Sequence, residues 1–353
     1  MPAQDRILEE IAAAGGWTSF ARYMQLALHE PGIGYYASGA RKFGARGDFV
    51  TAPELGSLFG RTLARALRPF DRILELGAGS GALADVLTRE LECEYWVLET
   101  SAELRARQRA RLDDRVRHLE RLPERFRGAV IANEVVDAMP VHVVHWTEAG
   151  IMEHGVGIRG RSPNSVFVWV DRPAEGELLA AAQRITVPTP YVSEIGLAAR
   201  AWMRTLARTV ESGATFVIDY GFPAREYYHP QRASGTLMCH FQHRAHADPF
   251  VRPGEEDITA HVDFSALAAA AMEGGAQVLG YTTQAQFLVN CGITDVLAEA
   301  NVQNALHYAP LAAEAQRLLS PAEMGELFKV LAVGTADCPA LSGFASGDRR
   351  ASL

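Results

Sequence analysis

The sequence feature that most restricts the fold is a glycine-rich turn in the segment ILELGAGSGALADVL. Residues 72–76, before the turn, form a short apolar run that predicts a buried strand. Residues 81–91, after it, have the apolar spacing of an amphipathic helix. A strand that enters a helix through such a turn is typical of the first unit of a doubly wound sheet. The sequence therefore predicts an α/β fold.

Strand and helix patterns continue to alternate along the chain. The expected strands cover residues 95–99, 116–119, 128–133, 215–219, 277–281 and 328–333, and the expected helices include 102–112, 192–211 and 262–272. Strands separated by helices of this length predict βαβ units in a parallel sheet. The alternation breaks at residues 141–171, which predict three antiparallel strands inserted into the series.

Charge and cysteine spacing exclude several classes of protein. With 34 Lys+Arg against 42 Asp+Glu, the formal net charge is −8, so the chain lacks the basic field that a general nucleic-acid binder needs. The four cysteines include no CxxC pair, and we expect no metal site. The sequence contains no apolar run of about 18 residues, so it predicts no membrane-spanning helix. No signal or transit peptide is visible in residues 1–10, so we expect a cytoplasmic protein.

The glycine turn is compatible with two kinds of cofactor. Gly77, Gly79 and Ala82 satisfy the G-x-G-x-x-G/A pattern of dinucleotide sites. Glu75, Gly77, Gly79 and Gly81 satisfy E-x-G-x-G-x-G, which methyltransferases that use S-adenosylmethionine favour. A carboxylate at Glu75 would repel a pyrophosphate but suits the ammonium group of a methionine. Glu99 ends the second strand, where an acid can bind ribose hydroxyls.

A second polar group follows the strand at residues 128–133. Asn133, Glu134 and Asp137 come at its carboxyl end, where doubly wound sheets bind ligands. These residues could face the reacting group and position a cationic or amide substrate. The structural alternative is a helix capped by Asn133 with Asp137 exposed.

The histidines allow more than one interpretation. We expect His240, His243 and His246 to form a polar loop wall rather than a metal site, since the predicted element is a loop. His261 either lies in a helix capped by Asp257 and Thr259 or enters the cleft as a proton acceptor.

Several motifs in order make the chain resemble the MidA-type methyltransferases, a family with mitochondrial and bacterial members. They are GYY (residues 34–36), GDFVTAPELGSLFG (47–60), ELGAGSG (75–81), NEVVDAMP (133–140), IDYGF (218–222), SGTL (234–237) and DITAHVDF (257–264). The resemblance covers about residues 4–334. It implies a class I methyltransferase sheet of seven strands, mostly parallel with one antiparallel strand, and S-adenosyl-L-methionine as methyl donor.

The resemblance also implies roles for individual residues. Those expected at the cofactor are Glu75, Gly77, Ala78, Gly79, Gly81, Glu99, Thr51 and Pro53, and those expected at the transferred methyl group are Asn133, Glu134 and Asp137. The segment 48–54 is expected to cover the cleft. Because the mitochondrial member methylates arginine on a core subunit of respiratory complex I, the implied activity is protein arginine methylation, here in a bacterial cytoplasmic protein.

The expected organisation is one sheet with additions. Residues 1–67 would form a helical cap with a glycine-rich active-site loop, 68–335 the methyltransferase domain with insertions at about 141–190 and 220–259, and 336–353 a flexible tail. Three other functions stay open: an assembly factor that binds S-adenosylmethionine without catalysis, a small-molecule methyltransferase and, less favoured because of Glu75 and Gly81, an NAD-dependent dehydrogenase.

Overall fold

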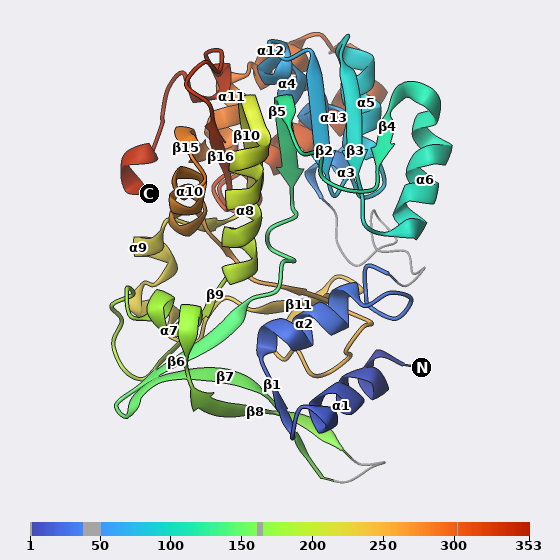
Figure 1. Cartoon of the computed structure of the whole chain (residues 1–353). Coiled ribbons are helices and arrows are strands. Elements are labelled where there is room, and N and C mark those ends of the chain that lie inside the picture. Colours follow the sequence, from blue (N-terminus) through green and yellow to red (C-terminus); the bar gives the residue numbers. More distant parts are fainter. Residues whose placement is uncertain (1, 38–50, 161–164, 302) are drawn as a thin grey trace.

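The computed structural model describes residues 2–37, 51–160, 165–301 and 303–353. A large sheet with helices on both faces forms one part of the molecule, and the N-terminal helices pack with a smaller sheet to form the other (Figure 1). The N-terminus lies in the smaller part and the C-terminus beside the large sheet (Figure 1). None of the helices in the described ranges has the length and apolar character to cross a membrane.

The large sheet has the strand order β15-β16-β10-β5-β2-β3-β4, and the short β14 (Val262–Asp263) pairs with β10. The strands are β2 (Arg72–Leu76), β3 (Glu94–Leu98), β4 (Arg117–Leu119), β5 (Phe126–Asn133), β10 (Val210–Phe222), β15 (Gln277–Thr283) and β16 (Phe328–Gly334). Only β16 runs antiparallel to its neighbours, β10 and β15. The predicted, mostly parallel α/β sheet is confirmed. The strand order reverses between β2 and β5, which opens a crevice at their carboxyl ends.

Helices cover both faces of this sheet. One face packs against α4 (Leu58–Leu67), α5 (Ala82–Glu90), α11 (Gln284–Asn290), α12 (Ile293–Ala298) and α13 (Ala305–Leu319), with α6 (Ala102–Leu112) beside α5, and the other face packs against α8 (Leu197–Thr209) and α10 (Phe264–Glu273). Successive side chains of β10 point to opposite faces of the sheet. Phe216 and Ile218 pack in the apolar cluster on the first face, and Val217 packs in the cluster on the second. Residues 58–67, which the sequence groups with the cap, thus belong to the sheet's core.

The smaller part joins segments that are far apart in the sequence. Its elements are α1 (Ala3–Ala13), β1 (Trp17–Thr18), α2 (Phe20–His29), β6 (His142–Thr147), β7 (Gly150–Arg159), β8 (Val166–Pro173), α7 (Gly176–Ala182) and β9 (Tyr191–Ile195). Ile7 and Phe20 of the helices pack against Val143 and Phe167 of the inserted strands. The strands β6, β7 and β8 are antiparallel, as predicted.

The loop expected at 220–259 contains further regular structure. After α9 (Ala224–Tyr227), β11 (Met238–Phe241) pairs with β12 (Arg244–His246) and β13 (Asp257–Thr259) in a three-stranded sheet. Short elements elsewhere are α3 (Ala52–Leu55) and the 3₁₀ turns Asp113–Arg115, Pro230–Arg232, Ser342–Phe344 and Arg350–Ser352.

Two predictions about local structure are wrong. The helix expected at 192–211 begins only at Leu197, because the preceding residues pair with β6 as β9. The tail at 336–353, expected to be flexible, packs against the sheet. Phe344 is 9% exposed and its ring centroid lies 5.3 Å from that of Phe287. Gly280 makes room for Phe344, since a Cβ at that position would lie 2.2 Å from the phenylalanine ring.

Candidate active site

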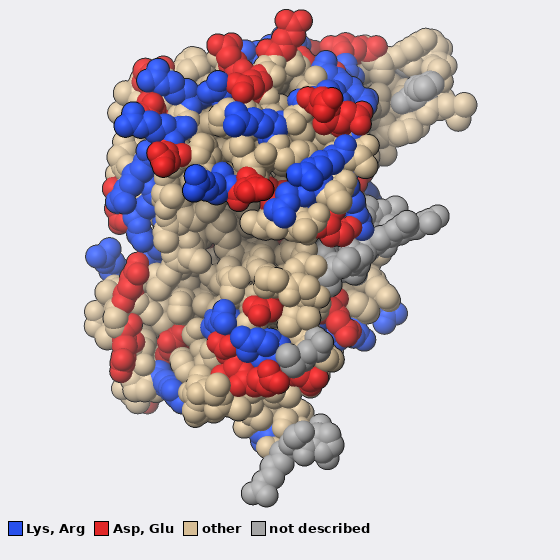
Figure 2. Space-filling model, turned by 45° about the vertical axis from the view of Figure 1, so that its right-hand side comes forward, with Lys and Arg blue, Asp and Glu red and all other residues tan. Residues whose placement is uncertain are grey.

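A cavity of about 500 Å³ lies at the carboxyl ends of the central strands. Its lining comes from the ends of β2, β3, β5 and β10, from α3, and from the small sheet β11–β13. The surface is hollowed between the two parts of the molecule (Figure 2). The cavity therefore occupies the place that doubly wound sheets use for ligands.

The glycine turn forms one wall of this cavity. Gly77, Ala78 and Gly79 line it, whereas Gly81 lies behind them as the N-cap of α5. The three glycines have φ values of +64°, +54° and +79°, a left-handed region that favours glycine. A Cβ on Gly77 would lie only 2.9 Å from Cγ2 of Val135. The turn thus depends on glycine for both its backbone conformation and its close packing.

The two acids expected at the cofactor lie beside the turn. Glu75 is buried and accepts a hydrogen bond of 2.7 Å from the Tyr95 hydroxyl. Burial raises the pKa of Glu75 to about 7. Glu99 accepts a hydrogen bond of 2.9 Å from the Ser101 amide, and Gln108 donates both to Glu99 and to the carbonyl of Gly79. Gln108 therefore connects the acid at the end of β3 to the glycine turn.

The residues after β5 form the opposite wall. No helix follows this strand, so the alternative of a capped helix is wrong, and Asn133, Glu134 and Asp137 all line the cavity. Oε1 of Glu134 lies 3.2 Å from the amide of Ala52 and 3.2 Å from the side-chain nitrogen of Asn133, both of which donate to it. Glu134 has a φ of +52°, which is rare outside glycine. The turn thus holds this carboxylate against the cavity.

Burial changes the charge state of these acids. It raises the pKa of Glu134 to about 8, with the nearby Asp137 adding to the effect, and it raises the pKa of Asp137 to about 6. Oδ1 of Asp137 is buried without a hydrogen-bond partner. The group can therefore bind a cation and exchange protons near neutral pH.

Sequence reasoning missed Asp219, which lies fully buried near the carboxyl end of β10. Its Oδ2 accepts hydrogen bonds from the amides of Val136 at 3.0 Å and Asp137 at 3.3 Å. Burial and the neighbouring Asp137 raise the pKa of Asp219 well above its ordinary value. Asp219 therefore holds the turn that carries Glu134 and Asp137. An acid at the end of the predicted strand 215–219, in the IDYGF motif, was the available signal.

Two further groups in the cavity come from distant segments. The Tyr36 hydroxyl donates to Oδ1 of Asp257 at 2.8 Å. His261 lies between Tyr220 and Phe222, with ring centroids 5.2 Å and 5.3 Å apart. Burial lowers the pKa of His261 to about 4, so this side chain is neutral at pH 7.

The capping alternative for His261 is wrong. The helix α10 begins at Phe264, and Asp263 caps it by accepting from the amide of Ala266. Asp257 and Thr259 instead belong to β13. His261 precedes the helix and lines the cavity.

The remaining predicted residues lie at the cavity or outside the described chain. Thr51, Pro53 and Glu54 line the cavity, and the Ser80 hydroxyl donates to Glu54. Residues 48–50 of the segment expected to cover the cleft lie outside the described residues. His240 lines the cavity, whereas His246 pairs with Glu256 elsewhere in the small sheet.

The charges of the lining decide which ligand fits. Six carboxylic acids face the cavity, and among the described residues that line it there is no lysine or arginine: the acids are Glu54, Glu75, Glu99, Glu134, Asp137 and Asp257. A pyrophosphate would be repelled here, which disfavours a dinucleotide. A cofactor with a sulfonium and an ammonium group fits the same lining, as does a cationic substrate.

Comparisons with known proteins agree with this chemistry. Residues 58–282 match the family described as "Putative S-adenosyl-L-methionine-dependent methyltransferase". A crystal structure from Burkholderia thailandensis, bound to S-adenosyl-homocysteine, is 50% identical, has a TM-score of 0.94, and aligns over 99% of this chain and 96% of its own.

Curated relatives include proteins named "Protein arginine methyltransferase NDUFAF7, mitochondrial". The zebrafish (Danio rerio) protein is 29% identical over 93% of this chain and 86% of its own length. The human (Homo sapiens) protein is 26% identical over 94% of this chain and 83% of its own length.

Proposed function

We propose that this chain, which belongs to the family of S-adenosyl-L-methionine-dependent methyltransferases, methylates arginine side chains of a protein substrate. The cofactor, S-adenosyl-L-methionine, supplies an electrophilic methyl group on a positively charged sulfur. The observation that carries the substrate proposal is the excess of carboxylic acids around the cavity. The names of the curated relatives support the same substrate class.

We assign the cofactor to the wall formed by the glycine turn. The residues proposed to hold it are Glu75, Gly77, Ala78, Gly79, Glu99, Thr51 and Pro53, with Gly81 supporting the turn from behind. Glu75 and Glu99 offer carboxylate oxygens for an ammonium group and for ribose hydroxyls. The left-handed glycines let a ligand approach the backbone closely.

We assign the substrate to the wall formed by Asn133, Glu134 and Asp137. A guanidinium is a poor nucleophile while its charge is spread over three nitrogens. Carboxylates that pair with two of its nitrogens can localise the charge there and leave electron density on the third. Asn133 orients Glu134, and Asp219 acts as a positioning residue because it holds the amides of the same turn.

The raised pKa values give these acids a second role. In the absence of a cation, Glu134 keeps its proton at neutral pH, because its pKa is about 8. A bound guanidinium favours the carboxylate, so substrate binding should release a proton. The nitrogen that accepts the methyl group must also lose a proton, and a carboxylate that titrates near neutrality is a suitable acceptor.

The variant Glu134→Gln tests this assignment. Glutamine keeps the shape of the side chain but cannot carry the negative charge, so turnover should fall by about 10–150-fold if one charge-assisted hydrogen bond of about 1.5–3 kcal/mol is lost. Affinity for S-adenosyl-homocysteine, measured by calorimetry, should stay unchanged. Glu211→Gln is the matched control, because Glu211 lies at the end of β10 that is remote from the cavity and pairs with exposed arginines. Unchanged turnover in Glu134→Gln would contradict the assignment.

The methylated residue can be identified directly. The protein is incubated with labelled S-adenosylmethionine and an extract of a strain that lacks it, and labelled proteins are located by mass spectrometry. Label on arginine supports the proposal, and label confined to small molecules contradicts it. Cofactor binding without any transfer would favour the alternative of a non-catalytic assembly factor.

We further propose that the substrate is a subunit of respiratory complex I, as the resemblance in the sequence implies. The same experiment tests this, because the labelled band must then belong to that complex.

We also propose that the protein acts in the bacterial cytoplasm. The support is its 50% identity to a bacterial protein, against 29% or less to the curated mitochondrial relatives described above. Fractionation of cells that express a tagged chain checks the location, and recovery in the membrane or periplasmic fraction would contradict it.

A further inference from the structure

Cys239, His246 and Glu256 meet at the three-stranded sheet β11–β13, and none of these three residues lines the cavity. The pairing of β11 with β12 places Cys239 directly opposite His246. Ile258 of β13 lies opposite Cys239, and Glu256 directly precedes β13. One ligand atom from each of the three side chains lies within 4.8 Å of the others.

The burial of this group is unusual for its polarity. Cys239 and Glu256 are fully buried, and Cys239 belongs to the cluster that α1 and α2 form with the inserted strands. Oε2 of Glu256 lies 3.0 Å from Nε2 of His246. Oε1 of Glu256 and Nδ1 of His246 are both buried without a hydrogen-bond partner. Buried carboxylate oxygens are rarely left unpaired, because the loss of hydration is costly.

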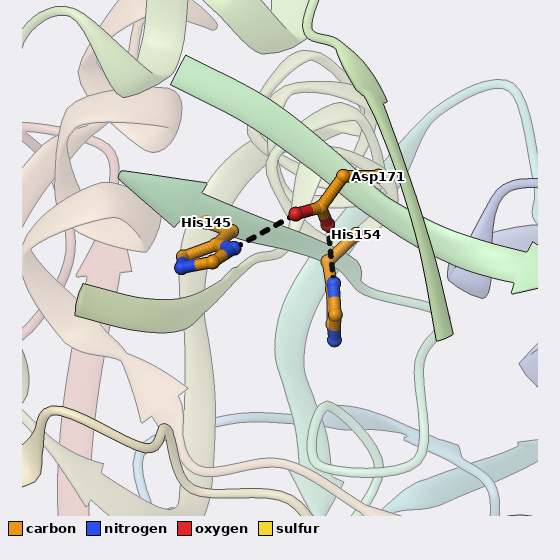
Figure 3. Close-up of side chains that lie close together, drawn as sticks. All are labelled: His145, His154 and Asp171. Carbon is orange, nitrogen blue, oxygen red and sulfur yellow. Dashed lines mark hydrogen bonds and ion pairs between the residues drawn. The ribbon is translucent and has the colours of Figure 1, made fainter. Parts of the chain in front are cut away.

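A second group of residues with metal-binding side chains differs from this buried group in its pairing and exposure. His145, His154 and Asp171 lie on adjacent strands of the inserted sheet, and both imidazoles point toward the one carboxylate (Figure 3). Nδ1 of His145 is 2.9 Å from one oxygen of Asp171, and Nδ1 of His154 is 2.5 Å from the other. These side chains are 21–31% exposed. Their converging nitrogen and oxygen atoms already pair with one another, and the side chains are partly exposed to solvent. The group is therefore stable without a metal ion.

We propose that Cys239, His246 and Glu256 bind a zinc ion, with water from the exposed side of His246 completing the coordination. A thiolate, an imidazole and a carboxylate are the ligand types that Zn²⁺ takes in proteins. A cation at this place would pair with the carboxylate oxygen that has no hydrogen-bond partner. Binding converts the Cys239 thiol to a thiolate and releases its proton to solvent.

The sequence gives no standard zinc spacing, since the three ligands are isolated rather than arranged as CxxC pairs. Strand pairing brings Cys239 and His246 together, and the segment that leads into β13 adds Glu256.

A metal here would support the active-site wall. Met238 and His240 flank Cys239 on β11 and line the cavity. Their side chains point to the face opposite that of Cys239, because successive residues of a strand alternate. An ion bound to Cys239 on one face of β11 would therefore also fix the position of Met238 and His240 on the other face, which lines the cavity.

Cobalt titration tests the site without relying on activity. The full chain is stripped with a chelator and titrated with Co²⁺, which gives a near-ultraviolet charge-transfer band only when a thiolate binds it. We expect a saturable 1:1 band that Zn²⁺ abolishes. Cys239→Ser should lose the band, and His246→Asn and Glu256→Gln should weaken the binding. Cys291→Ser, at another buried cysteine, and His154→Asn, in the group of Figure 3, should keep the band.

The outcomes that would overturn the proposal are equally direct. They are the absence of a thiolate band in the unaltered chain at saturating Co²⁺ and an equal band in Cys239→Ser. If Cys239→Ser does not fold, Glu256→Gln decides, because glutamine keeps the side-chain shape. Unchanged cobalt affinity in that variant would mean that the three residues form only a hydrogen-bonded group. Zinc should also raise the Tm of the stripped chain, but not that of His246→Asn.

Discussion

Replacing Gly77 by alanine should destabilise the glycine turn through two effects that can be separated. Gly77 has a φ of +64°, and the left-handed conformation costs an L-residue about 1–2 kcal/mol. The new Cβ would lie 2.9 Å from Cγ2 of Val135, so Val135 must move. Overpacking of this kind costs about 1–3 kcal/mol. The free energy of unfolding should therefore fall by about 2–5 kcal/mol in Gly77→Ala.

A second substitution isolates the steric part. Val135→Ala removes the methyl group that meets the new Cβ. In that background Gly77→Ala should cost only the backbone strain of about 1–2 kcal/mol, which leaves a coupling of about 1–3 kcal/mol between the two positions. Gly15→Ala is the matched control for strain alone, because Gly15 has a φ of +76° and its Cβ would meet nothing within 4 Å.

The affinity for cofactor should respond as well. A strained turn in Gly77→Ala can relax when no ligand is bound, and binding must then restore it. Strain that relaxes in this way no longer lowers the free energy of unfolding and appears in binding instead. Relief of the whole backbone strain would lower the affinity for S-adenosyl-homocysteine by up to about 30-fold and leave a loss of stability of about 1–3 kcal/mol. Gly15→Ala should leave that affinity unchanged.

Urea unfolding of the four proteins in the Gly77–Val135 cycle, together with calorimetric titration of S-adenosyl-homocysteine, measures both quantities. Two results would refute the reasoning. One is a Gly77→Ala variant as stable as the unaltered chain, and the other is a double variant whose loss is the sum of the single losses.

Three other predictions follow from the buried groups. Phe344→Ala should lower the free energy of unfolding by about 3 kcal/mol in urea unfolding, whereas a flexible tail would give no change. The folded chain holds a proton on Glu134 between its ordinary pKa of 4.5 and its raised pKa of about 8. Unfolding free energy should therefore fall as pH rises through this window, and Glu134→Gln should reduce that slope. Asp219→Ala should lower kcat while affinity for S-adenosyl-homocysteine is kept; equal loss of both would contradict its role as a positioning residue.

The parallel sheet could be predicted from the sequence because its signals are local. Apolar runs of five to eight residues, such as β2 and β5, are separated by helices with clear amphipathic spacing. The glycine turn has a steric cause that is visible in the sequence itself. Where pairing with a distant strand overrides local preference, as at β9, the prediction failed.

The composition of the tail was equally misleading. Residues 336–353 are mostly small and polar, which is typical of a mobile segment. One aromatic side chain, Phe344, anchors them because Gly280 on β15 leaves space for its ring. The hollow that receives it cannot be recognised before the two segments are placed together.

The sequence by itself determined the sheet, the glycine turn and the acids at the ends of its strands, because the carboxyl ends of parallel strands meet at one edge. Only the tertiary structure decided how the second wall is built. Tyr36 and Asp257 are 221 residues apart and form a hydrogen bond there. Asp219 became a support of the turn that carries Glu134 and Asp137 only through the amides it meets. Long-range strand pairing and burial decide such contacts, and burial also sets the charge states on which the proposed chemistry depends.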